Sequence, residues 1–166
     1  MAVSRRVLRA LIKLNLLMGF AILVLLIASL VAPEPVIRAL GARPSADYST
    51  LILGMRLIMV IGICAVPVTH IVLTRLLAIV ETVKVGDPFV SENAARLQTI
   101  AWAVLALELM HLVAGAIAAS ASSEAQPLDI DWNFSVTRWL AVLLLFVLAR
   151  VFDHGARMRE DLEGTV

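Results

Sequence analysis

The chain has 166 residues, of which 61% are hydrophobic and 16% are charged, and its formal net charge is +1. This composition excludes a water-soluble globular domain and is typical of an integral membrane protein. The small net charge also argues against direct nucleic-acid binding, because such a surface concentrates Lys and Arg on one face. We expect an all-α bundle of four transmembrane helices that forms a single membrane domain over residues 1–166.

The chain begins with a short basic segment. Its basic residues are Arg5, Arg6, Arg9 and Lys13. A run without charge follows from Leu14 to Ala32 and predicts a first span over about residues 10–32. A cleaved signal peptide is the alternative, but this run is longer than the usual signal-peptide core, and Leu30-Val31-Ala32 is a poor cleavage site.

Two prolines, Pro33 and Pro35, should stop the first helix, and the connection that follows is predicted to be a turn-rich loop. The next apolar segment predicts a second span over about residues 48–74, although it contains Arg56 and Pro67. Small residues such as glycine within the spans can line close contacts between helices.

The second helix should continue beyond the membrane. Apolar residues recur at helical spacing among charged ones after residue 75, which predicts an amphipathic cytoplasmic extension within residues 75–96. Gly86-Asp87-Pro88 should interrupt this extension. Ser91 is placed to cap the helix that leads into the third span.

The third span is predicted over about residues 97–121 and the fourth over about residues 132–150. The fourth is short and contains Arg138, so it must recruit preceding residues or let Arg138 snorkel toward the interface. Beyond it, apolar residues at steps of three and four predict a helical cytoplasmic extension within residues 151–166. Its apolar stripe is formed by Val151, Met158 and Leu162.

The basic residues are distributed asymmetrically between the two sides of the predicted bundle. With four spans, ten of the fourteen Lys and Arg residues lie on the side of the two termini, two lie on the opposite side, and two lie within spans. Basic residues are enriched on the cytoplasmic side of membrane proteins. Both termini are therefore predicted to be cytoplasmic.

Glu108 lies near the middle of the third span. It is eleven residues beyond Leu97, or about 16 Å at about 1.5 Å per residue, in a hydrocarbon core about 30 Å thick. A charge at this depth costs about 2.5 to 3.5 kcal/mol, so Glu108 should pair with Arg56 or Arg138. His111 lies one turn further on the same face. These four residues are predicted to form an intramembrane polar cluster, which is a structural ion pair, a ligand or proton site, or a metal site.

The metal interpretation is disfavoured because ligands are missing. Di-iron bundles require the Glu-x-x-His pair twice together with two further carboxylates, and this chain has the pair once. The sequence has no phosphate loop, nucleophile elbow or zinc spacing. Its single cysteine, Cys64, can form no internal disulfide. We expect no enzymatic activity, no catalytic residue, no metal and no cofactor.

Two cytoplasmic motifs carry a resemblance. The first combines Gly86-Asp87-Pro88-Phe89 with the following Glu92-Asn93 and Arg96-Leu97, and the second is the ending Asp161-Leu162-x-x-Thr165-Val166. With the layout of the spans, they resemble the bacterial four-helix membrane family catalogued as domain of unknown function 2975. The resemblance implies the bacterial inner membrane as location. It also implies a small Cro/C1-type helix-turn-helix regulator as partner, because members are often encoded beside one.

Two functions of different classes follow. In the first, the protein is a membrane-bound regulatory or scaffold subunit that docks a cytoplasmic partner. The docking residues would be Gly86, Asp87, Pro88, Phe89, Met158, Leu162, Thr165 and Val166. In the second, it is a small sensor or transporter with a ligand or proton site in the polar cluster. Homo-oligomerisation is left open, and the apolar stripe of the tail could instead pack on the chain's own extension of the second helix.

Overall fold

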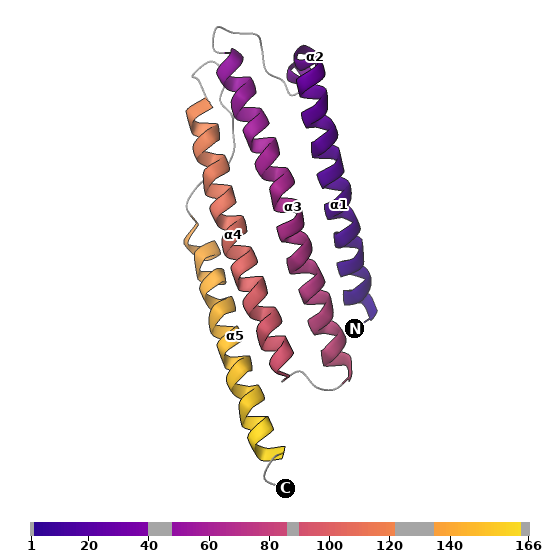
Figure 1. Cartoon of the computed structure of the whole chain (residues 1–166), viewed down its shortest axis with the longest axis vertical. Helices are drawn as coiled ribbons and strands as arrows, with labels where there is room; N and C mark the ends of the chain where they lie inside the picture. The colour runs from indigo at the N-terminus through magenta and orange to yellow at the C-terminus, as the bar shows by residue number, and fades with distance from the viewer. Residues whose placement is uncertain (1, 40–47, 86–89, 122–134, 164–166) are drawn as a thin grey trace. The chain divides into compact units, whose positions relative to one another are not determined.

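A computed structural model of the chain describes residues 2–39, 48–85, 90–121 and 135–163. Within these ranges every residue is helical except Ala32, Val90 and Ser135, so the described chain is all-α. Five helices follow one another along the sequence (Figure 1). They are α1 (Ala2–Val31), α2 (Pro33–Ala39), α3 (Tyr48–Val85), α4 (Ser91–Ala121) and α5 (Val136–Glu163).

The first helix ends where the prolines predict, but the connection begins differently from the prediction. α1 stops at Val31, and the short helix α2 covers Pro33–Ala39, where a loop was expected. Both prolines lie in the first turn of α2, where a helix has no intrahelical partner for its N–H groups. A proline there loses no hydrogen bond, so the same residues that end α1 also begin α2. The remainder of the predicted loop, residues 40–47, lies outside the described residues.

The helix that contains the second apolar segment continues beyond it, as predicted, whereas the cytoplasmic location of this extension stays a prediction. α3 runs without interruption from Tyr48 to Val85, through Pro67. It ends immediately before Gly86, and α4 begins at Ser91. The tail is also helical as predicted, because α5 continues to Glu163.

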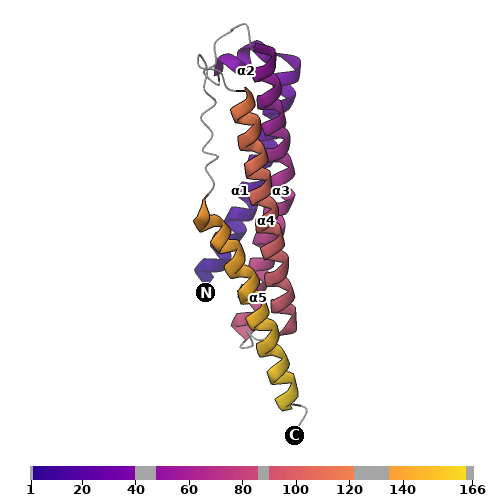
Figure 2. The same cartoon turned by 90° about the vertical axis from the view of Figure 1, so that its left-hand side faces the viewer.

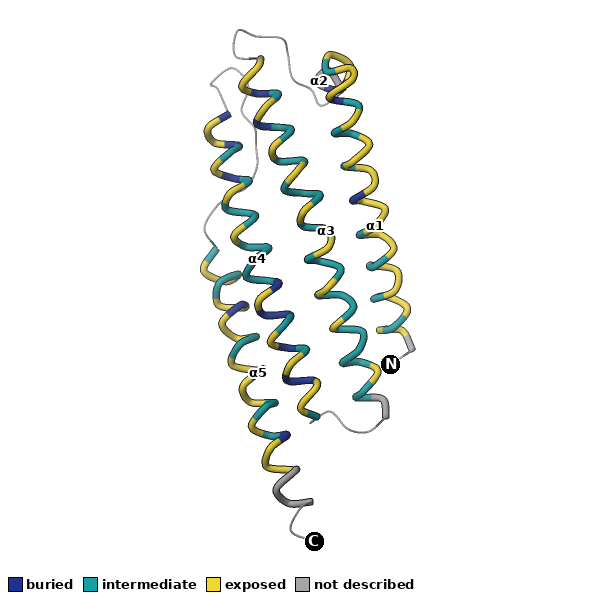
Figure 3. The backbone as a smooth tube through the Cα atoms, in the orientation of Figure 1, coloured by how far each residue is buried: buried dark blue, intermediate teal, exposed yellow. Residues whose placement is uncertain are grey.

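Among the residues that the structure describes, three helices are long and apolar enough to cross a membrane: Val3–Val31, Ser49–Val83 and Ser91–Ala121. Large apolar side chains such as Leu17, Phe20 and Leu30 are exposed on α1, as they would be in contact with lipid (Figure 3). The uncharged part of α5, residues 139–149, is only about 16 Å long at about 1.5 Å per residue. The four-span bundle therefore stays a prediction, whereas a multi-pass membrane protein is supported.

The chain divides into two compact units, which are described separately. Unit 1 comprises Met1–Asn15, Val68–Glu108 and Ser135–Val166, and unit 2 comprises Leu16–Pro67 and Leu109–Phe134. In unit 1, α4 and α5 pack side by side (Figures 1 and 2). The buried residues of α5 are Val142, Ala149 and Ala156, at seven-residue steps. This spacing places a stripe of mostly small side chains against α4, whose buried residues in this unit include Ala94, Leu97 and Ala101.

Unit 2 is held together by close approach of helices at glycine, as the small residues of the spans suggested. A Cβ atom at Gly19 would lie 2.7 Å from Val66 Cγ2. A Cβ atom at Gly54 would overlap the Cβ atom of Ala121, which is rigidly attached to the α4 backbone. Lipid tails are as apolar as the side chains, so the hydrophobic effect does not drive membrane helices together. Close packing contacts such as these therefore contribute to their association.

Replacing Gly54 by Leu is expected to destabilise the protein by about 1 to 3 kcal/mol, because the larger side chain forces α3 away from α4 in unit 2. The matched control is Gly62→Ala, whose new Cβ would make an ordinary contact of 3.5 Å with Ile22 Cδ1. Denaturation of the detergent-purified variants measures both. Equal stability of Gly54→Leu and Gly62→Ala would contradict the close contact.

Candidate functional site

Glu108 pairs with Arg138, one of the two arginines that the sequence offered. The Oε2 atom of Glu108 on α4 lies 3.7 Å from an Nη atom of Arg138 in the first turn of α5. The Glu108 side chain is 14% exposed and that of Arg138 is 36% exposed. The pair belongs to unit 1 and joins α4 to the start of α5. It gives the carboxylate the counter-charge that its depth in an apolar helix requires.

Arg56 finds a partner that the sequence analysis missed. Its Nε donates to Ser29 Oγ at 3.0 Å, and one Nη donates to the carbonyl oxygen of Ser29. That carbonyl would normally accept from the residue four positions later, which is Pro33 and has no N–H. The guanidinium therefore donates to a carbonyl that has no donor within α1. Its positive charge also interacts favourably with the negative, C-terminal end of the helix dipole. Ser29 is only 5% exposed, and as a polar residue inside an apolar run it was the signal available in the sequence.

His111 has a buried ring nitrogen, Nε2, without a hydrogen-bond partner, and the same holds for Nδ1 of His70. His111 and Arg56 belong to unit 2, whereas Glu108 and Arg138 belong to unit 1. Within unit 1 Glu108 pairs with Arg138, and within unit 2 Arg56 binds Ser29 at the end of α1. Among the described residues, no group of three His, Cys, Asp or Glu side chains could hold a metal ion.

A second polar centre joins the end of α3 to the start of α4. Asn93 is completely buried. Its Oδ1 accepts from the Thr82 hydroxyl at 3.0 Å and from the Arg96 guanidinium at 2.8 Å. Arg96 also lies 3.4 Å from the Glu92 carboxylate. Asn93 and Arg96 are three residues apart and so lie on one face of α4, and this spacing was the signal in the sequence for a network.

The predicted docking residues fall into two groups. Gly86, Asp87, Pro88, Phe89, Thr165 and Val166 lie outside the described residues. Leu162 lies within α5, and Met158 is 52% exposed. Val151, from the same predicted apolar stripe, is 56% exposed. Packing of this stripe on the chain's own α3 stays an alternative.

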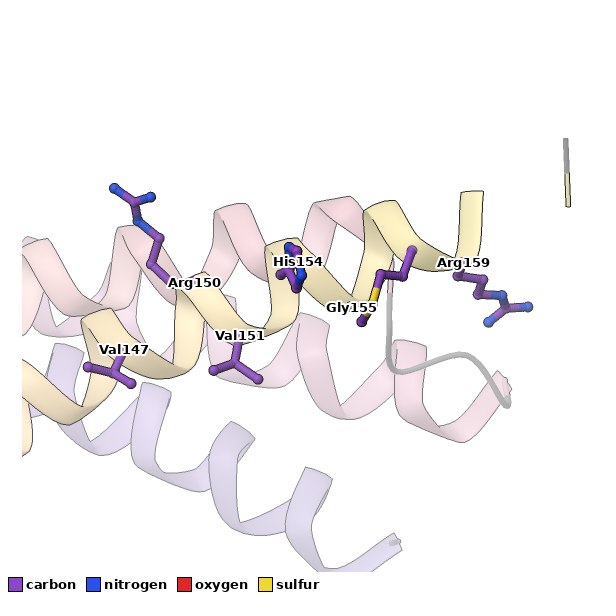
Figure 4. A pocket seen from close by; sticks show the side chains of 7 residues that line it. Val147, Arg150, Val151, His154, Gly155 and Arg159 are labelled. Atoms are coloured by element: carbon purple, nitrogen blue, oxygen red, sulfur yellow. The ribbon is translucent and has the colours of Figure 1, made fainter. Parts of the chain in front are cut away.

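The exposed apolar residues of α5 border a shallow hollow of about 650 Å³. Val147 and Val151 point to the same side of the helix, Arg150 points to the other side, and Arg159 lies near the end of α5 (Figure 4). Met158 continues the apolar face toward the end of α5. The surface formed by Val147, Arg150, Val151, His154, Gly155, Met158 and Arg159 is called the α5 docking face below. An apolar strip with a cationic border suits an amphipathic helix with acidic flanks.

The fold and these sites define a class: an all-helical, multi-pass membrane protein whose described polar residues form ion pairs and hydrogen-bond networks between helices. The chain matches a family model described as a protein of unknown function, DUF2975, over residues 27–166. It belongs to this family, as the Gly86-Asp87-Pro88-Phe89 motif and the C-terminal motif indicated. No curated protein and no solved structure matches the chain significantly.

Proposed function

We propose that the protein is a membrane-bound regulatory or scaffold subunit that docks a soluble helical partner on the α5 docking face. The observation that carries the proposal is the exposure of Val151 and Met158 on a helix whose opposite stripe is buried against α4. An amphipathic helix exposed to water has little reason to keep such a stripe apolar unless a partner covers it. The partner class that fits, by resemblance to the family, is a small helix-turn-helix regulator. The protein itself has no enzymatic role in this proposal.

The proposal includes a topology of four spans with both termini in the cytoplasm of a bacterial cell. It is supported by the bias of Lys and Arg toward one side and by the three apolar helices. α5 would complete the bundle if residues before Val136 extend its apolar stretch.

Cysteine labelling tests this topology in a Cys64→Ser background. Ser4→Cys should react only with a membrane-impermeant reagent applied from the cytoplasmic face, and Ser123→Cys only from outside. Thr165→Cys provides the matched site at the other end of the chain and should behave like Ser4→Cys. Opposite labelling of Ser4→Cys and Thr165→Cys would show an odd number of spans and refute the four-span bundle.

Docking is tested by co-expression with a small Cro/C1-type helix-turn-helix regulator, the partner class that the resemblance to the family implies. Val151→Glu combined with Met158→Glu should abolish co-purification of the regulator, because two carboxylates would have to be buried in the interface. Deleting Met158 to Val166 should do the same while membrane insertion is retained. Val3→Glu is the matched control, since Val3 is a 71% exposed valine on α1. Undiminished capture by the double variant would rule out the α5 docking face.

One observation favours a second function, a small sensor or transporter with an intramembrane ligand or proton site. His111 keeps a buried, unpartnered Nε2, and buried polar atoms without a partner are uncommon, so this nitrogen is open to a ligand or a proton. His111→Phe should then abolish a ligand-dependent or proton-dependent response of the reconstituted protein while leaving its stability unchanged or higher. A structural role predicts no change in any such response.

A further inference from the structure

A second hollow in unit 1 lies between the start of α4 and the middle of α5 and shares Arg150 with the α5 docking face. Its volume is about 630 Å³, within the range of small-molecule sites. The residues that line it are apolar at one end and polar at the other. Trp102 and Phe146 line one end, and Ser91 and Arg157 line the other.

The apolar end is formed by an aromatic pair. The rings of Trp102 and Phe146 meet edge to face with centroids 5.1 Å apart, and Trp102 remains 58% exposed. Tryptophan with one side open is typical of the boundary between hydrocarbon and headgroups. The eleven residues from Ser91 to Trp102 span about 16 Å at about 1.5 Å per residue. The hollow is therefore long enough to cross the headgroup layer and enter the hydrocarbon, given a headgroup layer of about 5 to 7 Å on each side.

The polar end carries cationic groups. Arg157 is paired with Asp153 at 3.0 Å. Arg150 lines the same hollow, is exposed, and makes no ion pair within the described part of the chain. One arginine is thus held in place by its carboxylate, while the other is available to an external anion. A guanidinium presents a planar set of donors that suits a phosphate group.

We propose that this hollow binds one anionic glycerophospholipid, with the headgroup phosphate at Arg150 and Arg157 and the acyl chains passing over Trp102 and Phe146. A free phosphate would use only the cationic end. A phospholipid would occupy both ends, with its phosphate at the cationic end and its acyl chains at the aromatic end. The polar and apolar residues of the lining follow the same order as the headgroup and the acyl chains. The site shares Arg150 with the α5 docking face, but its α4 residues Ala95, Gln98 and Trp102 do not belong to that face.

Fluorescence quenching at Trp102 tests the proposal. Trp102 is made the single tryptophan by Trp132→Phe and Trp139→Phe, and the protein is reconstituted into phosphatidylcholine vesicles. Brominated phosphatidylglycerol should quench Trp102 with a relative binding constant about fivefold higher than brominated phosphatidylcholine at the same mole fraction. Arg150→Gln should remove this preference. The matched control Arg75→Gln, an exposed arginine that lines neither hollow, should retain it.

A steric variant tests the hollow without changing its charge. Ala95→Phe fills it from the exposed side of α4 and should also remove the preference, whereas Ala141→Phe, an exposed alanine of α5 outside the hollow, should not. Equal quenching by the two brominated lipids in the parent protein would overturn the proposal. So would a preference that survives Ala95→Phe, or one that inorganic phosphate in millimolar excess abolishes, since the last result would identify a free-phosphate site.

Discussion

Replacing Glu108 by Gln is expected to destabilise the detergent-purified protein by about 1 to 3 kcal/mol. The substitution keeps the shape of the side chain but leaves the guanidinium of Arg138, 3.7 Å away, without its counter-charge. Breaking a fully buried pair costs more. Arg138 is 36% exposed and can turn toward the interface, and interhelical polar contacts in membranes are individually modest, so the lower range is expected. Denaturation followed by the loss of helical circular dichroism measures the change.

The pairing itself is tested by a double-mutant cycle. Arg138→Gln combined with Glu108→Gln should cost less than the sum of the single substitutions by at least about 0.5 kcal/mol. Arg56→Gln provides the matched control, because Arg56 already donates to Ser29 at the end of α1. Its effect should be additive with Glu108→Gln. Coupling of Glu108 to Arg56 instead of Arg138 would show that the pair is wrong.

The helices could be predicted from the sequence because their signals are local. Apolar runs longer than about 20 residues predict spans, and the continuation of helical periodicity after residue 75 predicted the full length of α3. The incorrect prediction of a loop where α2 lies also has a local cause. The same two prolines can end one helix and begin another. Pro33 and Pro35 alone do not show whether a loop or a new helix follows α1.

The site was harder to predict because it depends on contacts between helices. The sequence indicated that Glu108 needs an arginine but left two candidates, since depth in the membrane does not say which helices are neighbours. Ser29 and the missing N–H of Pro33 decide the partner of Arg56, and that argument requires the packing of α1 against α3 within unit 2. Asn93 was missed for a similar reason. Asn93 is next to Thr82 of α3 in the folded chain, and this contact between two helices cannot be read from the sequence.

Asn93→Leu is expected to destabilise the protein by about 1 to 3 kcal/mol, although it exchanges a polar side chain for an apolar one of similar size. The loss of Oδ1 leaves Thr82 and Arg96 without their shared acceptor in a completely buried position. The Thr82 hydroxyl can still donate to the carbonyl of Ile79 at 2.8 Å. Arg96 keeps only a 3.4 Å contact with an exposed Glu92 carboxylate. Most of the cost should therefore come from Arg96.

This assignment makes two variants informative. Asn93→Asp retains an acceptor beside Arg96 and should be close to the parent protein in stability, measured by denaturation in the same detergent. Asn93→Leu with Arg96→Met should cost less than the sum of the singles, because no guanidinium is then left without its acceptor. Thr82 and Asn93 flank the segment that contains Gly86-Asp87-Pro88-Phe89, so Asn93→Leu should also weaken capture of the helix-turn-helix regulator if that segment takes part in docking. Full stability of Asn93→Leu would show that the Thr82–Asn93–Arg96 network does not hold the two helices together.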